Sequence, residues 1–241
     1  MNDKNLAQRL TEATTKQTSY QPNDMIAKQM QKKVLVMLVS PAAMGKSYLI
    51  KRAAGSAPDL SQVSVFTTRG PRPDDDPGMF RSLLTEEQIN GLLDKIENGE
   101  VVQYVIHPTH HTVYGSEISD YRSRYNLLAM LSGGVETMRM LPFGGTVTIG
   151  LITDPATWQK RFDTKFPPGH PERPKRLQEA VISLEWLAGQ PAESLWWLIN
   201  NDDNLTASIE RLTRLCHGRS GFSQDGKQLA IDCLTLAKTL H

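Results

Sequence analysis

The sequence contains little cysteine, and that excludes several kinds of site. Two cysteines occur, Cys216 and Cys233, and neither belongs to a Cys-x-x-Cys pair or has a histidine at metal-ligand spacing. A disulfide-stapled fold and a cysteine-based zinc site are therefore not indicated. We expect two free, buried thiols.

The sequence also lacks an excess of charge and a long apolar run. Lysine and arginine total 27 against 26 aspartate and glutamate, so no global field favours nucleic acid or an anionic membrane as a partner. No apolar run approaches the ~20 residues of a membrane span, and the polar N-terminus does not resemble a signal peptide. We expect a cytoplasmic protein in which any phosphate binding is local.

The pattern of strands and helices indicates an α/β fold. Of the 241 residues, 39% are apolar and 22% charged, as in a globular protein. The apolar run 34–39 predicts a strand buried on both faces of a parallel sheet, followed by a helix over 45–54 and a strand over 62–67. Further strands are expected at 101–106, 125–131, 146–152 and 195–200, and helices at 85–98, 204–217 and 227–240. Residues 1–31 predict a loose polar extension with a short helix near 5–13.

A phosphate-binding loop follows the first strand. Residues 40–47, Ser-Pro-Ala-Ala-Met-Gly-Lys-Ser, match the pattern GxxxxGK[ST] except at Ser40, which is tolerated if its φ is negative. Backbone N–H groups and the helix N-terminus suit a phosphate chain. Lys46 would contact the β- and γ-phosphates of ATP, and the Ser47 hydroxyl would bind Mg²⁺. The expected ATP contacts are Ala42, Ala43, Met44, Gly45, Lys46, Ser47 and Tyr48.

Other segments resemble the guanylate kinases, in the same order along the chain. Thr67-Thr68-Arg69-Gly70-Pro71-Arg72-Pro73 resembles the family's Thr-Thr-Arg-x-Pro-Arg-Pro string, whose two arginine forks suit one phosphoryl group. Tyr114-Gly115-Ser116 resembles its Tyr-Gly-Ser/Thr, and Lys160-Arg161 and Arg176-Leu177 resemble elements of its lid. Residues 198–203 resemble the strand end beside the adenine of ATP, which adds Asn201 to the expected ATP contacts. The resemblance covers roughly residues 33–217.

The resemblance implies a P-loop NTPase core over 32–217 that uses ATP and Mg²⁺, with an acceptor-binding insertion at about 68–125 and a lid at about 155–178. Lys46, Arg161 and Arg176 would be catalytic, spreading the charge that develops during phosphoryl transfer. A small phosphorylated acceptor would be held by residues of the insertion: Arg69, Arg72, Arg81, Gln103, Tyr114 and Ser116. The polar segment 1–31 and a helical tail over 218–241 lie outside the resemblance and offer surfaces for self-association or a protein partner.

The sequence departs from the family where the family recognises guanine. Gln103 replaces an acid, and an amide cannot accept from both N–H groups on the guanine edge. Leu128-Ala129-Met130-Leu131 replaces Leu-Asp-Ile-Asp, which removes two further acids. Arg81 stands where a tyrosine contacts the phosphate, and Lys165 stands where the lid has an arginine. The phosphate-binding groups are thus kept and the base-recognising groups removed.

Three functions fit these departures. The first, which we favour, is an ATP-dependent kinase acting on another nucleoside monophosphate or on a sugar phosphate, as in the guanylate-kinase-like ribose bisphosphate kinases. The second is a catalytically inactive binding module for a phosphorylated partner, although Lys46 and Ser47 would then have no need to be kept. The third is a guanylate kinase in which Glu136 or the run Asp74-Asp75-Asp76 supplies the missing acids.

Overall fold

The computed structural model describes residues 5–72, 75, 78–107, 111–191, 194–201, 205–218 and 225–240. The chain divides into two compact units. Unit 1 comprises Met1–Val34, Gln62–Asn126 and Met140–Gly145, and unit 2 comprises Leu35–Ser61, Leu127–Arg139 and Thr146–His241. No helix among the described residues is long and apolar enough to cross a membrane.

A five-stranded sheet, most of whose residues belong to unit 2, has the strand order β2-β7-β1-β8-β9. These strands are β1 (Val34–Val39), β2 (Leu60–Gln62), β7 (Tyr125–Met130), β8 (Gly145–Ile152) and β9 (Trp196–Ile199). β1 is buried from Leu35 onward, as its unbroken apolar sequence predicts. β8 and β9 run parallel, with Ile149 beside Trp196. The predicted α/β class, a parallel sheet flanked by helices, is confirmed.

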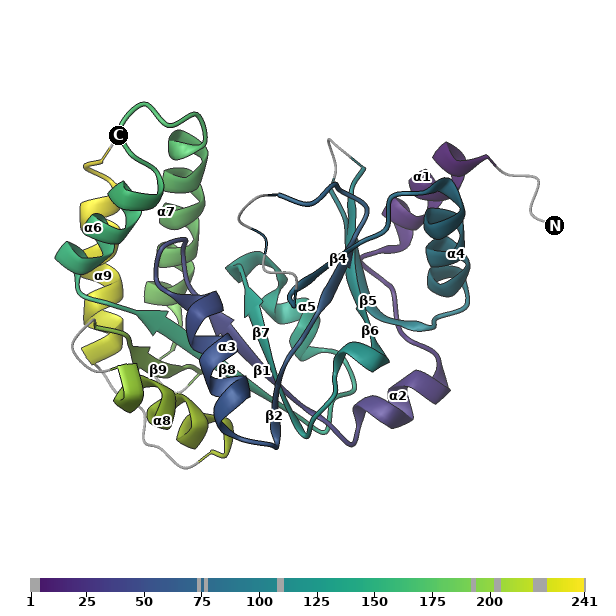
Figure 1. Ribbon diagram of the computed structural model, residues 1–241, viewed down its shortest axis with the longest axis horizontal. Coiled ribbons are helices and arrows are strands. Elements are labelled where there is room, and N and C mark those ends of the chain that lie inside the picture. The colour runs from purple at the N-terminus through teal and green to yellow at the C-terminus, as the bar shows by residue number, and fades with distance from the viewer. Residues whose placement is uncertain are drawn as a thin grey trace. The chain divides into compact units, whose positions relative to one another are not determined.

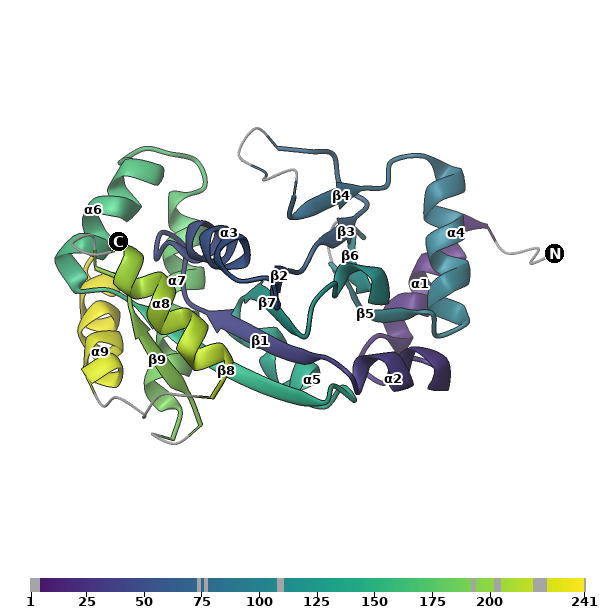
Figure 2. The same ribbon diagram turned by 60° about the horizontal axis from the view of Figure 1, so that its bottom comes forward.

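Helices cover this sheet (Figures 1 and 2). They are α3 (Lys46–Ser56), α5 (Val135–Arg139), α6 (Pro155–Lys165), α7 (Arg173–Gly189), α8 (Leu205–Cys216) and α9 (Asp225–Ala237), with the 3₁₀ turn η2 (Ser132–Gly134). α3 packs on α8, while α9 packs on α6, α7 and β9. α9 approaches β9 closely because Gly226 has no side chain: a Cβ there would lie 2.5 Å from the Trp197 ring. Cys216 and Cys233 are buried free thiols, as expected.

Unit 1 contains a four-stranded sheet with the order β4-β3-β6-β5. Its strands are β3 (Val65–Thr67), β4 (Phe80–Ser82), β5 (Val101–Ile106) and β6 (Val113–Glu117), and η1 (Ile118–Asp120) follows β6. β3 pairs in parallel with β4 and antiparallel with β6. The expectation of one strand over 62–67 is wrong, because the chain leaves the five-stranded sheet after Gln62 and enters the four-stranded sheet at Val65. β4 and β6 are too short and irregular in pattern to be predicted.

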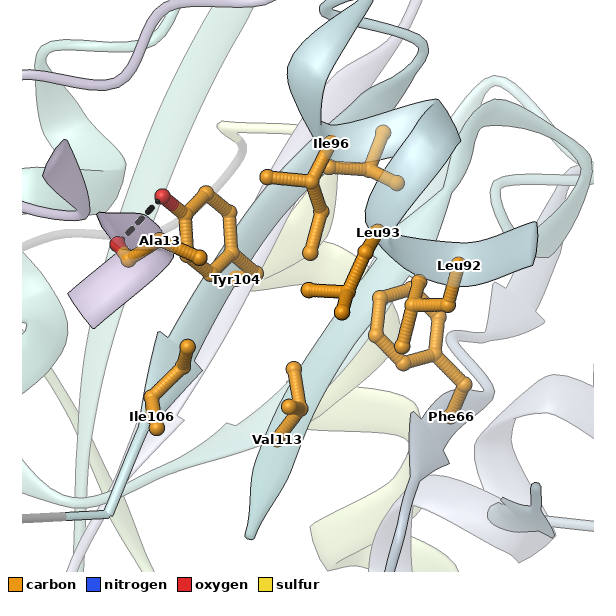
Figure 3. Packing of buried hydrophobic residues seen from close by; sticks show 9 residues of the cluster. Ala13, Phe66, Leu92, Leu93, Ile96, Tyr104, Ile106 and Val113 are labelled. Atoms are coloured by element: carbon orange, nitrogen blue, oxygen red, sulfur yellow. Dashed lines mark hydrogen bonds between the residues drawn. The ribbon is translucent and has the colours of Figure 1, made fainter. Parts of the chain in front are cut away.

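The N-terminal residues are part of the packed core of unit 1. α1 (Leu6–Lys16), α2 (Asp24–Met30) and α4 (Glu86–Glu97) accompany the sheet, and α1 packs on α4. Figure 3 shows Ala13 beside the cluster of Leu92, Leu93, Ile96 and Tyr104, and the Tyr104 hydroxyl donates to the Ala13 carbonyl at 2.8 Å. The expected helix near 5–13 is confirmed, but the expectation of a loose segment is wrong. Sparse apolar residues, Leu6, Leu10 and Ala13, form one face of α1 and suffice to bind it to the core.

Candidate phosphate-binding sites

The loop between β1 and α3 has the backbone conformation that its glycine permits. Gly45 has φ of 89° and Ala43 has φ of 66°, whereas Ser40 is not among the residues with positive φ. A Cβ on Gly45 would lie 2.6 Å from Nδ2 of Asn200, and this same Nδ2 donates to the Met44 carbonyl at 2.8 Å. Asn200, at the end of β9, therefore holds the loop in its curved form, and only glycine fits at position 45.

The Lys46 ammonium lies folded against its own loop. Nζ donates to the Ser40 carbonyl, to Ser40 Oγ at 3.0 Å and to the Pro41 carbonyl at 3.1 Å. Burial, and after it the nearby positive charge of Lys165, lower the pKa of Lys46 to about 7, while the Glu179 carboxylate acts in the opposite direction. The amine therefore donates to neutral acceptors and lies close to a cation, so an anionic ligand would stabilise its charged form.

A hollow of about 310 Å³ opens beside this loop in unit 2. It is lined by residues 41–48 and by Arg161 and Lys165 of α6. All the loop residues expected to contact ATP, together with the expected catalytic Lys46 and Arg161, thus come together at one hollow. Ser47 and Tyr48 are exposed, and the Tyr48 ring lies under the Arg52 guanidinium at 5.4 Å.

Two residues expected at the ATP site occupy other surroundings. Asn201 Oδ1 accepts a hydrogen bond from Thr153 Oγ1 at 3.0 Å, which joins the ends of β8 and β9. Arg176, on α7, binds Glu172 and Glu179, each at 2.8 Å, and is not among the residues that line the hollow. Arg161 donates to the carbonyl of Asn200, the residue that holds the loop, at 3.1 Å.

A second group of predicted residues lies in unit 1, around Arg69. The Arg69 guanidinium binds Asp75 through two hydrogen bonds of 2.7 Å, and the Arg72 backbone N–H donates to the same carboxylate at 2.8 Å. The hydrogen bonds from Arg69 hold the pKa of Asp75 below its ordinary value. The Phe80 ring lies 5.1 Å from the guanidinium carbon. Asp75 is thus held as a charged partner of the predicted phosphate-binding arginines, while Asp74 and Asp76 lie outside the described residues.

Arg81 is bound by two acids that no sequence motif indicates. Its guanidinium lies 3.1 Å from Glu117 and 3.6 Å from Asp120, and Lys95 binds Glu117 at 2.7 Å. Burial would raise the pKa of Glu117, but hydrogen bonds from Lys95 and Arg81 lower it below the ordinary value. The sequence pattern of β6 and of the turn after it does not predict these ion pairs, because the paired residues come from four different elements.

The remaining predicted acceptor residues lie on two paired strands. Tyr114 lies opposite Thr67 across β6 and β3. The hydrogen bonds that Arg69 donates to Asp75, and after them the nearby Tyr114, raise the pKa of Arg69. Gln103 lies opposite Ser116. Ser116 is fully buried and its hydroxyl is 2.9 Å from that of Tyr121, so it faces the interior of unit 1.

The candidate replacement acids are both engaged by arginines of their own units. Glu136, in unit 2, binds Arg139 at 2.9 Å. Asp75, in unit 1, binds Arg69. The Asp75 side chain is only 13% exposed against its arginine, whereas the Glu136 side chain is 66% exposed.

Comparisons with known proteins give distant relatives of one kind. No family model matches the chain. The chain is 27% identical over 187 residues to the guanylate kinase of Corynebacterium jeikeium, a match that covers 75% of this chain and 95% of the relative. Matches at 34% identity to the guanylate kinases of Corynebacterium glutamicum, over 70 residues, and Ruegeria pomeroyi, over 71, span only 35% and 32% of those relatives.

A solved structure, the guanylate kinase from Anaplasma phagocytophilum, aligns with 77% of this chain and 85% of its own at 14% identity, with a TM-score of 0.48. The chain is thus similar to these proteins at low identity.

Proposed function

We propose that this chain, a divergent relative of the guanylate kinases, transfers a phosphoryl group from ATP to a small acceptor that already bears a phosphate. The observation that supports this most strongly is the hollow beside Lys46. It joins a loop with the shape of a phosphate site to the ammonium of Lys46 and the guanidinium of Arg161. A protein that only binds a phosphorylated partner would have no use for this arrangement.

On the nucleotide side, the residues fit a triphosphate. The N–H groups of residues 42–47 and the N-terminus of α3 would surround the β-phosphate. Lys46 would exchange its contacts with Ser40 and Pro41 for contacts with phosphate oxygens, and Tyr48 would adjoin the remainder of the nucleotide. The exposed Ser47 hydroxyl would hold Mg²⁺, which would supply positive charge to neutralise the charge developing on the phosphates.

On the acceptor side, Arg69, Arg72 and Tyr114 would hold the phosphate already present on the acceptor. Two arginine forks are matched to a dianion. Gln103 makes guanine an unfavourable base, because its amide presents one acceptor and one donor where two acceptors are needed. We therefore propose another nucleoside monophosphate or a sugar phosphate as the acceptor.

The cations of α6 and α7 would act in the transfer itself. Arg161 lines the hollow already, and Lys165 lines it beside Arg161. Arg176 would have to leave Glu172 and Glu179 to take part. Exclusion of water by these helices would favour transfer to the acceptor over hydrolysis.

The test is ADP release with MgATP against a panel of nucleoside monophosphates and sugar phosphates. We expect turnover with at least one acceptor and its loss in Lys46→Ala, since this ammonium is the charge aimed at the phosphates. Lys51→Ala is the matched control, because Lys51 is an exposed lysine about one and a half turns further along α3. No ADP with any acceptor, together with tight binding of a phosphopeptide, would replace the kinase with the binding module.

A further inference from the structure

The contact between Arg69 and Asp75 has the form of an occupied phosphate site. Three donors converge on the two oxygens of Asp75: both terminal nitrogens of Arg69 at 2.7 Å and the backbone N–H of Arg72 at 2.8 Å. Carboxylate and phosphate oxygens match the planar guanidinium fork in the same way. Asp75 therefore satisfies the donors that a phosphate would otherwise satisfy.

The surroundings make this contact stronger than an ordinary surface ion pair. Both side chains are only 13% exposed, and Phe80 lies against the guanidinium. Exposed pairs contribute little because water and salt screen them, whereas a half-enclosed two-point pair is screened much less. A ligand that competes with Asp75 thus has to overcome a substantial interaction.

The remaining edge of the Arg69 guanidinium gives a ligand no second position. Nε is buried, so solvent does not reach that side, and Tyr114 lies close enough to the guanidinium to raise the pKa of Arg69. Nη1, which binds Asp75 Oδ2, also donates to the Gly70 carbonyl at 2.9 Å. The edge that could hold a phosphate is therefore the edge that Asp75 holds, and the two cannot occupy it together.

We propose that Asp75 is an internal competitor for the acceptor's phosphate: the free protein keeps Asp75 on Arg69 and Arg72, and a phosphorylated ligand binds there by displacing it. This inference rests on the proposed function, in which these arginines hold the acceptor's phosphate. The competition makes this site selective for phosphorylated ligands. A ligand bearing a phosphate dianion presents more charge and more oxygens than Asp75 does, whereas an unphosphorylated analogue offers nothing to exchange.

The experiment measures binding of inorganic phosphate by calorimetry, in a Lys46→Ala background that weakens the contribution of the other loop. Four proteins form a cycle: the background itself, Asp75→Asn, Arg69→Gln and the double variant. Asp75→Asn keeps the size of the side chain and removes its charge. We expect it to bind phosphate about tenfold more tightly or better, since the lost contact is a charge-assisted one, and we expect no such gain when Arg69 is also replaced.

Two results would overturn the proposal. One is that Asp75→Asn binds phosphate equally or more weakly, which would make Asp75 a group that positions Arg69. The other is an equal gain in the Arg69→Gln background. Asp94→Asn is the control for loss of one acidic charge from unit 1, because Asp94 binds Arg9 and not Arg69. Thermal unfolding of each variant verifies that the fold is retained.

The cycle also separates this inference from the proposed function. If Arg69→Gln weakens phosphate binding while Asp75→Asn does not strengthen it, the acceptor site stands and the competitor is refuted. If Arg69→Gln leaves phosphate binding unchanged, the acceptor site is itself misplaced, whatever ADP release shows.

Discussion

Lys46 makes nucleotide binding dependent on pH, in a direction set by its surroundings. In the free protein its pKa is lowered to about 7, first by burial and then by Lys165. Phosphates beside the ammonium favour its charged form and raise this pKa in the complex. Between the two values, binding of a nucleotide must take up a proton. At pH 8 the free lysine is about nine-tenths neutral, so we expect uptake of about 0.9 proton per nucleotide.

The magnitude follows from the same linkage. Above pH 7 each unit of pH should weaken nucleotide binding by up to about tenfold, which corresponds to ~1.4 kcal/mol, until the pKa of the complex is reached. The stability of the free protein changes with pH in the opposite direction to nucleotide binding. The unfolded chain binds this proton more tightly, so the lowered pKa costs stability at neutral pH, and the cost is relieved as the pH rises toward the ordinary value of lysine.

The assay is calorimetry of nucleotide binding at pH 8 in two buffers with different ionisation enthalpies, whose difference gives the protons taken up. The terminal phosphate of ATP is already ionised at this pH, since such groups have a pKa of ~6. Lys46→Arg is the control, because its guanidinium stays charged and should bind without uptake. Absence of uptake in the wild type, or equal uptake in Lys46→Arg, would refute the reasoning.

Three further predictions concern single positions. Gly45→Ala should weaken ATP binding at least tenfold, measured as a dissociation constant, because its Cβ would lie 2.6 Å from Asn200 Nδ2 at a φ of 89°. Tyr104→Phe should lower the free energy of unfolding by about 1 kcal/mol in a denaturant titration, through loss of its hydrogen bond to Ala13. Arg9→Met should lower it by about 2 kcal/mol. This loss is discounted because Asp94 and Glu97 are 65% and 39% exposed and regain water.

Matched variants sharpen these tests. Gly55→Ala, on α3 with no atom within 4 Å of its Cβ position, should leave ATP binding unchanged and raise stability by up to ~1 kcal/mol. Lys28→Met removes an exposed cation from α2 and should change stability by less than ~0.5 kcal/mol. If Arg9→Met has no larger effect than Lys28→Met, the first helix is not anchored as the structure indicates.

The sequence was sufficient for the elements whose cause is local. The loop over 40–47 is defined by consecutive residues between an apolar strand and a helix, so its position and the groups it carries follow from the sequence. The ends of helix α4 are likewise determined by neighbouring residues. Thr85 caps α4 through its own side chain, and Gly99, with φ of 71°, ends the turn that follows the helix. The α/β class followed from the alternation of such elements.

Tertiary structure alone decided which charges meet. Arg81, Lys95, Glu117 and Asp120 come from β4, α4, β6 and η1, and Arg9 reaches Glu97 across 88 positions. The spacing of charged residues along the sequence does not predict which of them pair. Their pairing depends on strand register and on loops that close over long stretches of chain. The sequence therefore predicted two groups of phosphate-binding residues. Only the fold decided that one of them, at Arg69, is already held by a carboxylate of the same chain.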